Sequence, residues 1–120
     1  MAKTVLLADD DRDDVELLRK KLEGAGYTVV TAHDGGRAIQ LAKERSPDLI
    51  ILDVRMPTLD GDLAYTYLKA PSSPVRHIPI LFVTGLKSEK DILEDGDEDV
   101  FAKPIKFDLL SARIRELIGN

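Results

Sequence analysis

The most constraining feature of the sequence is an apolar run, Leu49–Leu52, that ends in a carboxylate at Asp53. Every position of the run is apolar, which is typical of a strand buried on both faces of a parallel sheet. Its short length and the flanking Pro47 and Pro57 favour a strand over a buried helix. Reactive groups of open α/β sheets lie just beyond the carboxyl ends of such strands, which makes Asp53 a candidate site residue. Considered alone, an Asp at this position is more often a turn former or a helix cap.

Strand-like and helix-like segments alternate along the whole chain. Short apolar or β-branched runs predict five strands, and apolar residues at helical spacing predict a helix after each one. The expected strands are Thr4–Ala8, Tyr27–Ala32, Asp48–Val54, Ile78–Thr84 and Val100–Ala102. The expected helices cover approximately Val15–Gly24, Ala38–Ser46, Asp62–Lys69, Ser88–Glu94 and Phe107–Ile118. The fourth helix lies in a polar segment with few large apolar residues, so it is expected to be short and poorly buried.

This alternation predicts an α/β fold of the (βα)5 type, a doubly wound, parallel, five-stranded sheet with helices on both faces. The expected strand order is 2-1-3-4-5, in which the first and third strands are neighbours. Ligands of such sheets bind in the crevice at the carboxyl ends of these two strands. Asp9 and Asp10, which follow the first strand, should therefore share one crevice with Asp53.

Length and composition limit the classes of function. The 120 residues predict a single domain over residues 1–120, and the absence of cysteine excludes disulfides and thiolate metal sites. The net charge of -5 comes without a dense Lys/Arg cluster, which disfavours direct nucleic-acid binding. No apolar stretch approaches the ~20 residues needed to cross a bilayer, so no membrane association is predicted and a cytoplasmic location is expected.

Three carboxylates in one crevice require a counter-charge. At separations of about 5 Å, each pair repels by roughly 3 kcal/mol at an effective dielectric near 20. Magnesium is the expected cofactor, because it prefers one or two carboxylates together with waters and a phosphate oxygen. A calcium loop beginning at Asp9 is excluded, because Asp14 replaces the glycine that such a loop requires and Lys20 replaces its final glutamate.

Two more polar residues follow strands on the same side of the predicted sheet. Thr84 ends the fourth strand, and Lys103, with Pro104 after it, ends the fifth. A hydroxyl can donate to a phosphoryl oxygen, and an ammonium can offset the charge that develops during phosphoryl transfer. Taken singly, Thr84 is a common strand residue and Lys103 a common surface residue. Their combination with the carboxylates indicates phosphoryl chemistry.

Over its whole length the sequence resembles the receiver domains of two-component response regulators, which have the CheY-like, flavodoxin-like fold. The Asp9-Asp10 pair resembles the acidic pair of that family, and Asp53 in LIILDVRMPTLDG resembles its phosphoacceptor. Thr84 and Lys103-Pro104 stand where the family has its hydroxyl and its lysine.

This resemblance implies a function and its partners. Asp53 would accept a phosphoryl group from a sensor histidine kinase or a phosphotransfer protein, and the domain would assist its own phosphorylation and dephosphorylation. Asp10, Asp53 and the backbone carbonyl of Arg55 would bind magnesium, with Asp9 acting mainly through water. Phosphorylation would then change the conformation near the fourth and fifth strands and reach an output protein or domain that the sequence does not name. The Arg55 side chain is also a candidate for tuning the lifetime of the phosphate.

The sequence departs from the family pattern near the fifth strand. Val100 occupies the position where the family usually has a switching Tyr or Phe, and the Thr84-to-Lys103 spacing is about three residues shorter than usual, close to one helical turn. The segment 91–99 carries six acids in nine residues and is either a solvated loop or a docking patch for a basic partner. Asp99 and Arg113 resemble residues that pair between the two chains of a dimer in the DNA-binding branch of the family. A weak homodimer is therefore an alternative to a monomer.

Two functions of other classes share parts of this pattern. A magnesium-dependent phosphatase with an aspartyl nucleophile also forms a phosphoaspartate at a strand end, but it commonly has a second Asp where this chain has Arg55. A flavodoxin-type FMN carrier shares the strand order, yet the acids that follow the first strand would repel a phosphate. The sequence leaves open whether the chain is a single-domain regulator or a receiver from a longer protein.

Overall fold

The computed structural model describes residues 2–119 as five strands that alternate with five helices. The strands are β1 (Thr4–Ala8), β2 (Thr28–Ala32), β3 (Leu49–Asp53), β4 (Ile80–Thr84) and β5 (Val100–Ala102). The helices are α1 (Arg12–Gly24), α2 (Gly35–Arg45), α3 (Gly61–Leu68), α4 (Glu89–Asp95) and α5 (Phe107–Ile118). Each predicted element is present, and the largest differences are helices α1 and α2, which begin three residues earlier than the sequence pattern indicates.

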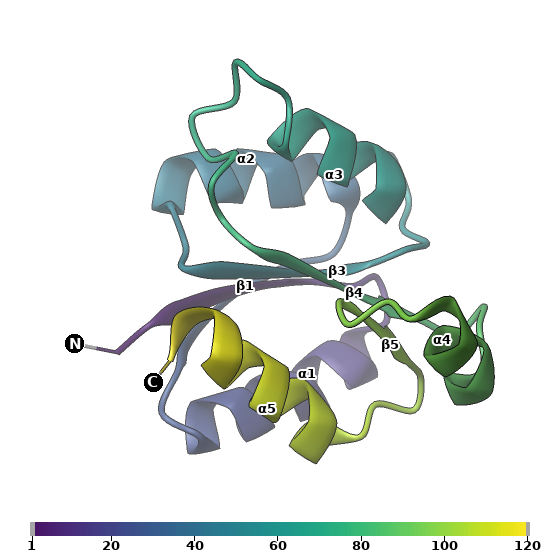
Figure 1. The fold of residues 1–120 in the computed structure, drawn as a ribbon. Coiled ribbons are helices and arrows are strands. Elements are labelled where there is room, and N and C mark those ends of the chain that lie inside the picture. Colours follow the sequence, from purple (N-terminus) through teal and green to yellow (C-terminus); the bar gives the residue numbers. More distant parts are fainter. Residues whose placement is uncertain (1, 120) are drawn as a thin grey trace.

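The strands form one parallel sheet in the order β2-β1-β3-β4-β5. Helices α2 and α3 cover one face of this sheet, whereas α1 and α5 cover the other (Figure 1). Helix α4 lies beside β5 at one edge (Figure 1). The predicted doubly wound (βα)5 fold with order 2-1-3-4-5 is therefore confirmed.

Burial on both faces explains the continuous apolar run of β3, in which all five residues are buried. Ile50 and Leu52 pack in the core between the sheet and the α2 and α3 face. Leu49 and Ile51 point the opposite way, into the core under α1 and α5. Successive side chains of a strand alternate between faces, so a strand in the middle of two helical layers needs apolar residues throughout.

Short polar side chains fix where three of the helices begin. Asp11 accepts the amides of Asp13 and Asp14 at 3.0 and 3.1 Å, which caps α1. Asp34 caps α2 by accepting the amide of Arg37 at 2.7 Å, and Ser88 forms a capping box at the start of α4. These caps satisfy backbone N–H groups that have no partner within the helix.

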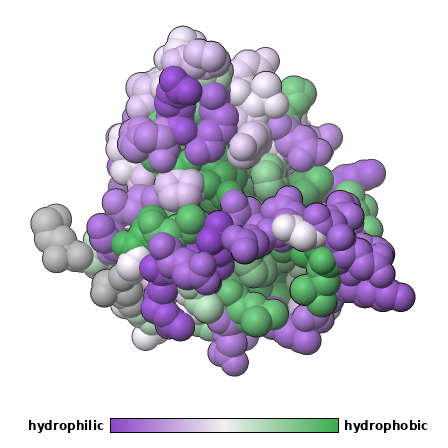
Figure 2. Space-filling model, viewed as in Figure 1, coloured by the Kyte–Doolittle hydropathy of each residue, from purple (hydrophilic) through white to green (hydrophobic). Residues whose placement is uncertain are grey.

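Helix α4 is the least buried helix, as the sequence predicts. It has seven residues, and Ile92 is its single buried side chain. Leu93 on the same helix is 76% exposed. Figure 2 shows hydrophobic side chains in a hollow of the surface near α4, β5 and α5. Among residues 2–119, no helix is both long enough and apolar enough to cross a bilayer.

Candidate functional site

The candidate site lies at the carboxyl ends of four neighbouring strands. Asp9 directly follows β1, Asp53 ends β3, Thr84 ends β4 and Lys103 directly follows β5. The pairing of Ala8 with Leu52 places Asp9 beside Asp53. Parallel strands end at one edge of the sheet, so residues far apart in the sequence meet there.

Three carboxylates form the centre of the site. Asp9, Asp10 and Asp53 each offer an oxygen, and these oxygens lie within 4.8 Å of one another. Asp9 and Asp53 are buried, with 3% and 6% of their surfaces exposed, whereas Asp10 is exposed. The cluster therefore has a buried base and one side open to solvent, which suits an ion that keeps some of its water.

Lys103 supplies the positive charge of the site. Its Nζ donates to Asp9 Oδ2 at 2.8 Å and to Asp53 Oδ2 at 3.1 Å. Three carboxylates and one ammonium leave a net charge of -2 in the cluster, which a divalent cation would offset. Oxygen ligands and this charge fit magnesium, so the residues present can hold the predicted cofactor.

The pKa values of two groups reflect this crowding. Burial raises the pKa of the Asp9 carboxyl above its ordinary value, although the hydrogen bond from Lys103 acts in the opposite direction. Burial alone would lower the pKa of the Lys103 ammonium, but its hydrogen bonds to Asp9 and Asp53 outweigh burial and raise it. Lys103 is therefore positively charged at neutral pH.

Glycine shapes the wall behind the site. A Cβ at Gly61 would lie 2.2 Å from the carbonyl oxygen of Asp53, so only glycine fits this close approach. The Gly61 amide also donates to the carbonyl of Val54 at 2.9 Å. The start of α3 thus presses directly against the backbone that carries Asp53. This contact was not predicted from the sequence.

The remaining predicted site residues occupy different surroundings. Thr84 is buried at the end of β4, where its hydroxyl oxygen accepts the amide of Leu86 at 3.0 Å. The backbone N–H of Arg55 donates to Asp53 Oδ1 at 3.3 Å, and the Arg55 residue is exposed to solvent. Val100 is half-buried and pairs with Phe82 in the sheet.

Two contacts at the site were missed from the sequence. Asp14 Oδ2 lies 3.3 Å from Lys103 Nζ, so a fourth acid approaches the same ammonium. The Nδ1 atom of His33 lies 3.3 Å from the backbone carbonyl oxygen of Asp9, and this histidine is half-buried. The position of Asp14 in the first turn of α1, three residues after the capping Asp11, is the signal that indicates the first contact.

Comparison with known proteins identifies the family. A sequence model of the response regulator receiver domain matches residues 5–115. The chain belongs to the response regulator receiver family. The receiver function predicted from the acidic pair, Asp53 and Lys103 is thereby confirmed at the level of the family: the domain is a phosphoacceptor of two-component signalling. Nothing in these comparisons favours the phosphatase alternative.

Relatives of this receiver domain have different overall lengths. It is 40% identical over 120 residues to the response regulator PleD of Caulobacter vibrioides, covering 98% of this chain and 26% of PleD. It is 31% identical over 123 residues to the polar-differentiation response regulator DivK of Brucella ovis, covering 100% of this chain and 99% of DivK. The chain thus spans about a quarter of PleD and nearly all of DivK.

A solved receiver structure provides a comparison for the site. The receiver domain of the sensor histidine kinase PA1611 from Pseudomonas aeruginosa PAO1 matches with a TM-score of 0.83 and 29% identity, covering 100% of both chains. That structure is described with a magnesium ion coordinated in its active-site cleft. In this receiver, Asp9, Asp10 and Asp53 form an acidic cluster that could hold a metal ion.

Proposed function

We propose that Asp53 is the residue that accepts the phosphoryl group, in a magnesium-dependent reaction with a histidine-phosphorylated donor. One observation carries the proposal: the buried Asp53 carboxylate lies between a lysine ammonium and two further carboxylates. Asp9 is also buried, but it follows β1, whereas Asp53 ends β3, the central strand of the sheet. Asp9 therefore lies on one side of Asp53 and the residues that end β4 and β5 lie on the other, and this central position favours Asp53 as the nucleophile.

Both oxygens of Asp53 are held in place before reaction. Oδ1 accepts the Arg55 amide at 3.3 Å, and Oδ2 accepts Lys103 Nζ at 3.1 Å. In the reaction, a carboxylate oxygen attacks phosphorus, a phosphorus–oxygen bond forms, and the phosphorus–nitrogen bond to the donor histidine breaks. The electron pair of the broken bond goes to the imidazole nitrogen, and Lys103 stabilises the charge on the phosphoryl oxygens.

Magnesium would be held by the carboxylates of Asp10 and Asp53 and the backbone carbonyl of Arg55, with Asp9 acting through water. When bound, the ion neutralises negative charge on the phosphoryl group and the carboxylates. The chain supplies positioning and charge stabilisation for both phosphoryl transfer and hydrolysis. It therefore assists its own phosphorylation and dephosphorylation.

The experiment that tests this assignment is phosphorylation with a small phosphodonor such as acetyl phosphate and magnesium. The wild type should gain one phosphate that is labile in both acid and base, measured by intact mass, and Asp53→Asn should gain none. Asp62→Asn, which changes an exposed acid on α3, should be labelled like the wild type. Full labelling of Asp53→Asn would refute the assignment.

The signal would leave the domain through the segment that follows Thr84. Residues 85–91 are all exposed, and the segment up to residue 99 buries Ile92 alone. Such a segment rearranges at low free-energy cost. The small Val100 side chain would displace little surface if it rotated.

Amide chemical shifts on adding a beryllofluoride phosphate mimic should therefore change mainly between residues 85 and 99, and Val100→Ala should preserve that response. Silence of this segment would exclude the route.

The wider biological role follows from the same proposal. The phosphodonor is a sensor histidine kinase or a phosphotransfer protein, and the output partner is a separate protein or an attached domain. Residues 1–120 would act as one receiver domain, and any homodimer would be weak. The cytoplasmic location stays a prediction.

A further inference from the structure

Lys103 contacts a third carboxylate besides those of Asp9 and Asp53. Its Nζ lies 3.3 Å from Asp14 Oδ2, compared with 2.8 Å from Asp9 Oδ2 and 3.1 Å from Asp53 Oδ2. A lysine ammonium has three N–H donors and no acceptor. Two of these donors bond to Asp9 and Asp53, which leaves the third for Asp14 or for a phosphoryl oxygen.

The start of α1 holds Asp14 beside this ammonium. The backbone amide of Asp14 donates to the capping Asp11 at 3.1 Å, which fixes the first turn of the helix. The Asp14 side chain is 46% exposed, whereas the side chains of Asp9 and Asp53 are 4% and 9% exposed. Asp14 therefore reaches Lys103 from the solvent side, and the other two carboxylates reach it from the interior.

A small pocket gives the ammonium room on the side of Asp14. The pocket has a volume of about 110 Å³, and both Asp14 and Lys103 line it, together with residues of α1, α5 and the connection between β5 and α5. A polar space of this size holds a few water molecules. Lys103 thus lies between a buried crevice and a hydrated pocket, and its ammonium can shift toward either.

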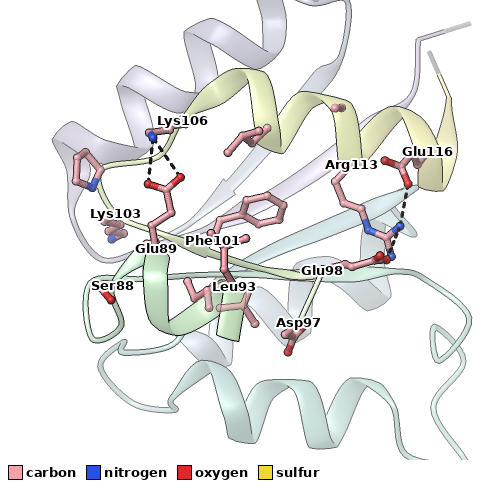
Figure 3. A pocket seen from close by; sticks show the side chains of 16 residues that line it. Ser88, Glu89, Leu93, Asp97, Glu98, Phe101, Lys103, Lys106, Arg113 and Glu116 are labelled. Carbon is pink, nitrogen blue, oxygen red and sulfur yellow. Dashed lines mark hydrogen bonds and ion pairs between the residues drawn. The ribbon is translucent and has the colours of Figure 1, made fainter. Parts of the chain in front are cut away.

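The charge of Asp14 acts on Lys103 rather than on another cation. Within residues 2–119, Lys103 is the one residue with which Asp14 forms an ion pair. Lys21 lines the same pocket but makes no ion pair with Asp14 in this part of the chain. Lys106, the next lysine after Lys103, is paired with Glu89 at 3.0 Å, as the dashed lines in Figure 3 show.

We propose that Asp14 is a positioning residue for Lys103, which competes with the phosphoryl group for the lysine ammonium and thereby slows phosphorylation of Asp53. The inference rests on the proposed function, in which Lys103 stabilises charge on the phosphoryl oxygens. When an oxygen of Asp53 bonds to phosphorus, Lys103 has to turn an N–H toward the transferred group. An ammonium that stays with Asp14 provides less of this stabilisation.

Burial decides whether Asp14 hinders or helps the reaction. Lys103 stays anchored without Asp14, because the buried Asp9 holds it at the shortest distance of the three carboxylates. Removal of the Asp14 charge would therefore loosen Lys103 little, and it would free an N–H for the phosphoryl group. Ion pairs with an exposed partner are weak, so the expected gain in rate is about two- to fivefold.

Phosphorylation rates with two small donors test the proposal. Asp14→Asn should gain phosphate about two- to fivefold faster than the wild type, with acetyl phosphate and with phosphoramidate alike, in the presence of magnesium. In both reactions an oxygen of Asp53 attacks phosphorus, and acetate or ammonia leaves with the electron pair of the broken bond. Intact mass measures the rates. Direct repulsion between Asp14 and the donor would instead give a larger gain with the more negative acetyl phosphate.

Matched variants separate competition for Lys103 from a general effect of charge on α1. Asp13 lies in the same first turn, is exposed and makes no ion pair with Lys103 within residues 2–119. Asp13→Asn removes the same charge from the same helix terminus and should keep the wild-type rate. Asp14→Glu retains the charge and should also stay near that rate. The Nζ chemical shift of Lys103 should change in Asp14→Asn and not in Asp13→Asn.

Three results would overturn the inference. One is an equal rate for Asp14→Asn and Asp13→Asn. Another is slower phosphorylation of Asp14→Asn, which would show that Asp14 supports the lysine. The third is a gain with acetyl phosphate alone. In each case a wild type labelled at Asp53 would leave the proposed function intact, whereas a wild type that gains no phosphate would refute the proposed function and this inference together.

Discussion

Arg113 and Asp99 are paired within one chain: Arg113 Nε donates to Asp99 Oδ1 at 2.8 Å. Both residues resemble residues of the DNA-binding response regulators that pair between the two chains of a dimer. That resemblance predicts a pair between chains, whereas the structure shows a pair within one chain. Glu98 and Glu116 also contact the same guanidinium, at 3.6 and 3.3 Å. A pair across a dimer would have to replace contacts that Arg113 already makes, so it would contribute little to association.

The first prediction concerns self-association. The unphosphorylated protein should sediment as a monomer at micromolar concentrations, because the pair that would join two chains is satisfied within each chain. Arg113→Ala should leave the sedimentation profile unchanged. A stable wild-type dimer that Arg113→Ala dissociates would contradict this expectation and would support the pairing across chains.

The second prediction concerns magnesium. A ligand that binds only the folded state should stabilise the wild type by about 2.7 kcal/mol at 100 times its dissociation constant. Asp10→Ala should lose most of this stabilisation, since it removes one of the three clustered carboxylates. Asp62→Ala, an exposed acid outside the cluster, should keep it. The measurement is the thermal midpoint with and without magnesium, and equal shifts in all three proteins would argue against the metal site.

The third prediction concerns pH in the absence of magnesium. Burial raises the pKa of the Asp9 carboxyl in the folded protein above its ordinary value of 3.8. At pH values between 3.8 and this raised pKa, Asp9 is more protonated in the folded protein than in the unfolded chain. The contribution of Asp9 to stability therefore falls as pH rises through this window. The melting temperature of the wild type minus that of Asp9→Asn should decrease from about pH 4 toward neutrality. A constant or increasing difference would show that Asp9 has no raised pKa.

The fourth prediction concerns the wall behind Asp53. Gly61→Ala should destabilise the protein by about 1–3 kcal/mol, because its Cβ would overlap the Asp53 carbonyl and force the start of α3 outward. Gly24→Ala at the end of α1 is the control, since nothing lies within 4 Å of its Cβ. That control should be neutral or stabilising, by up to about 1 kcal/mol. Denaturant unfolding measures both, and equal effects would refute the proposed close approach.

The fifth prediction concerns the lifetime of the phosphate. The Arg55 side chain leaves the backbone two residues after Asp53 and is exposed at the mouth of the site. Its guanidinium could hold a phosphoryl oxygen or hinder the attacking water, and either action slows hydrolysis. Arg55→Ala should therefore lose its phosphate several-fold faster than the wild type. Identical dephosphorylation rates would show that Arg55 is simply a solvated side chain.

The sequence by itself determined the layers of the fold and the centre of the site. Leu49–Leu52 is apolar throughout because β3 is covered on both faces, and that requirement is visible in local composition. The alternation of strands and helices allows few topologies, which is why the strand order could be predicted. The carboxyl ends of parallel strands meet at one edge, so the positions of Asp9, Asp53 and Lys103 along the chain sufficed to bring them together.

Only the tertiary structure decided the contacts that depend on how separate elements pack. The sequence does not reveal that Gly61 touches the Asp53 backbone, that Asp14 approaches Lys103, or that Arg113 binds Asp99 within its own chain. Each contact depends on a distance of a few ångströms between residues that lie on different elements. Local pattern specifies which face of an element is buried, whereas side-chain packing specifies which atoms meet.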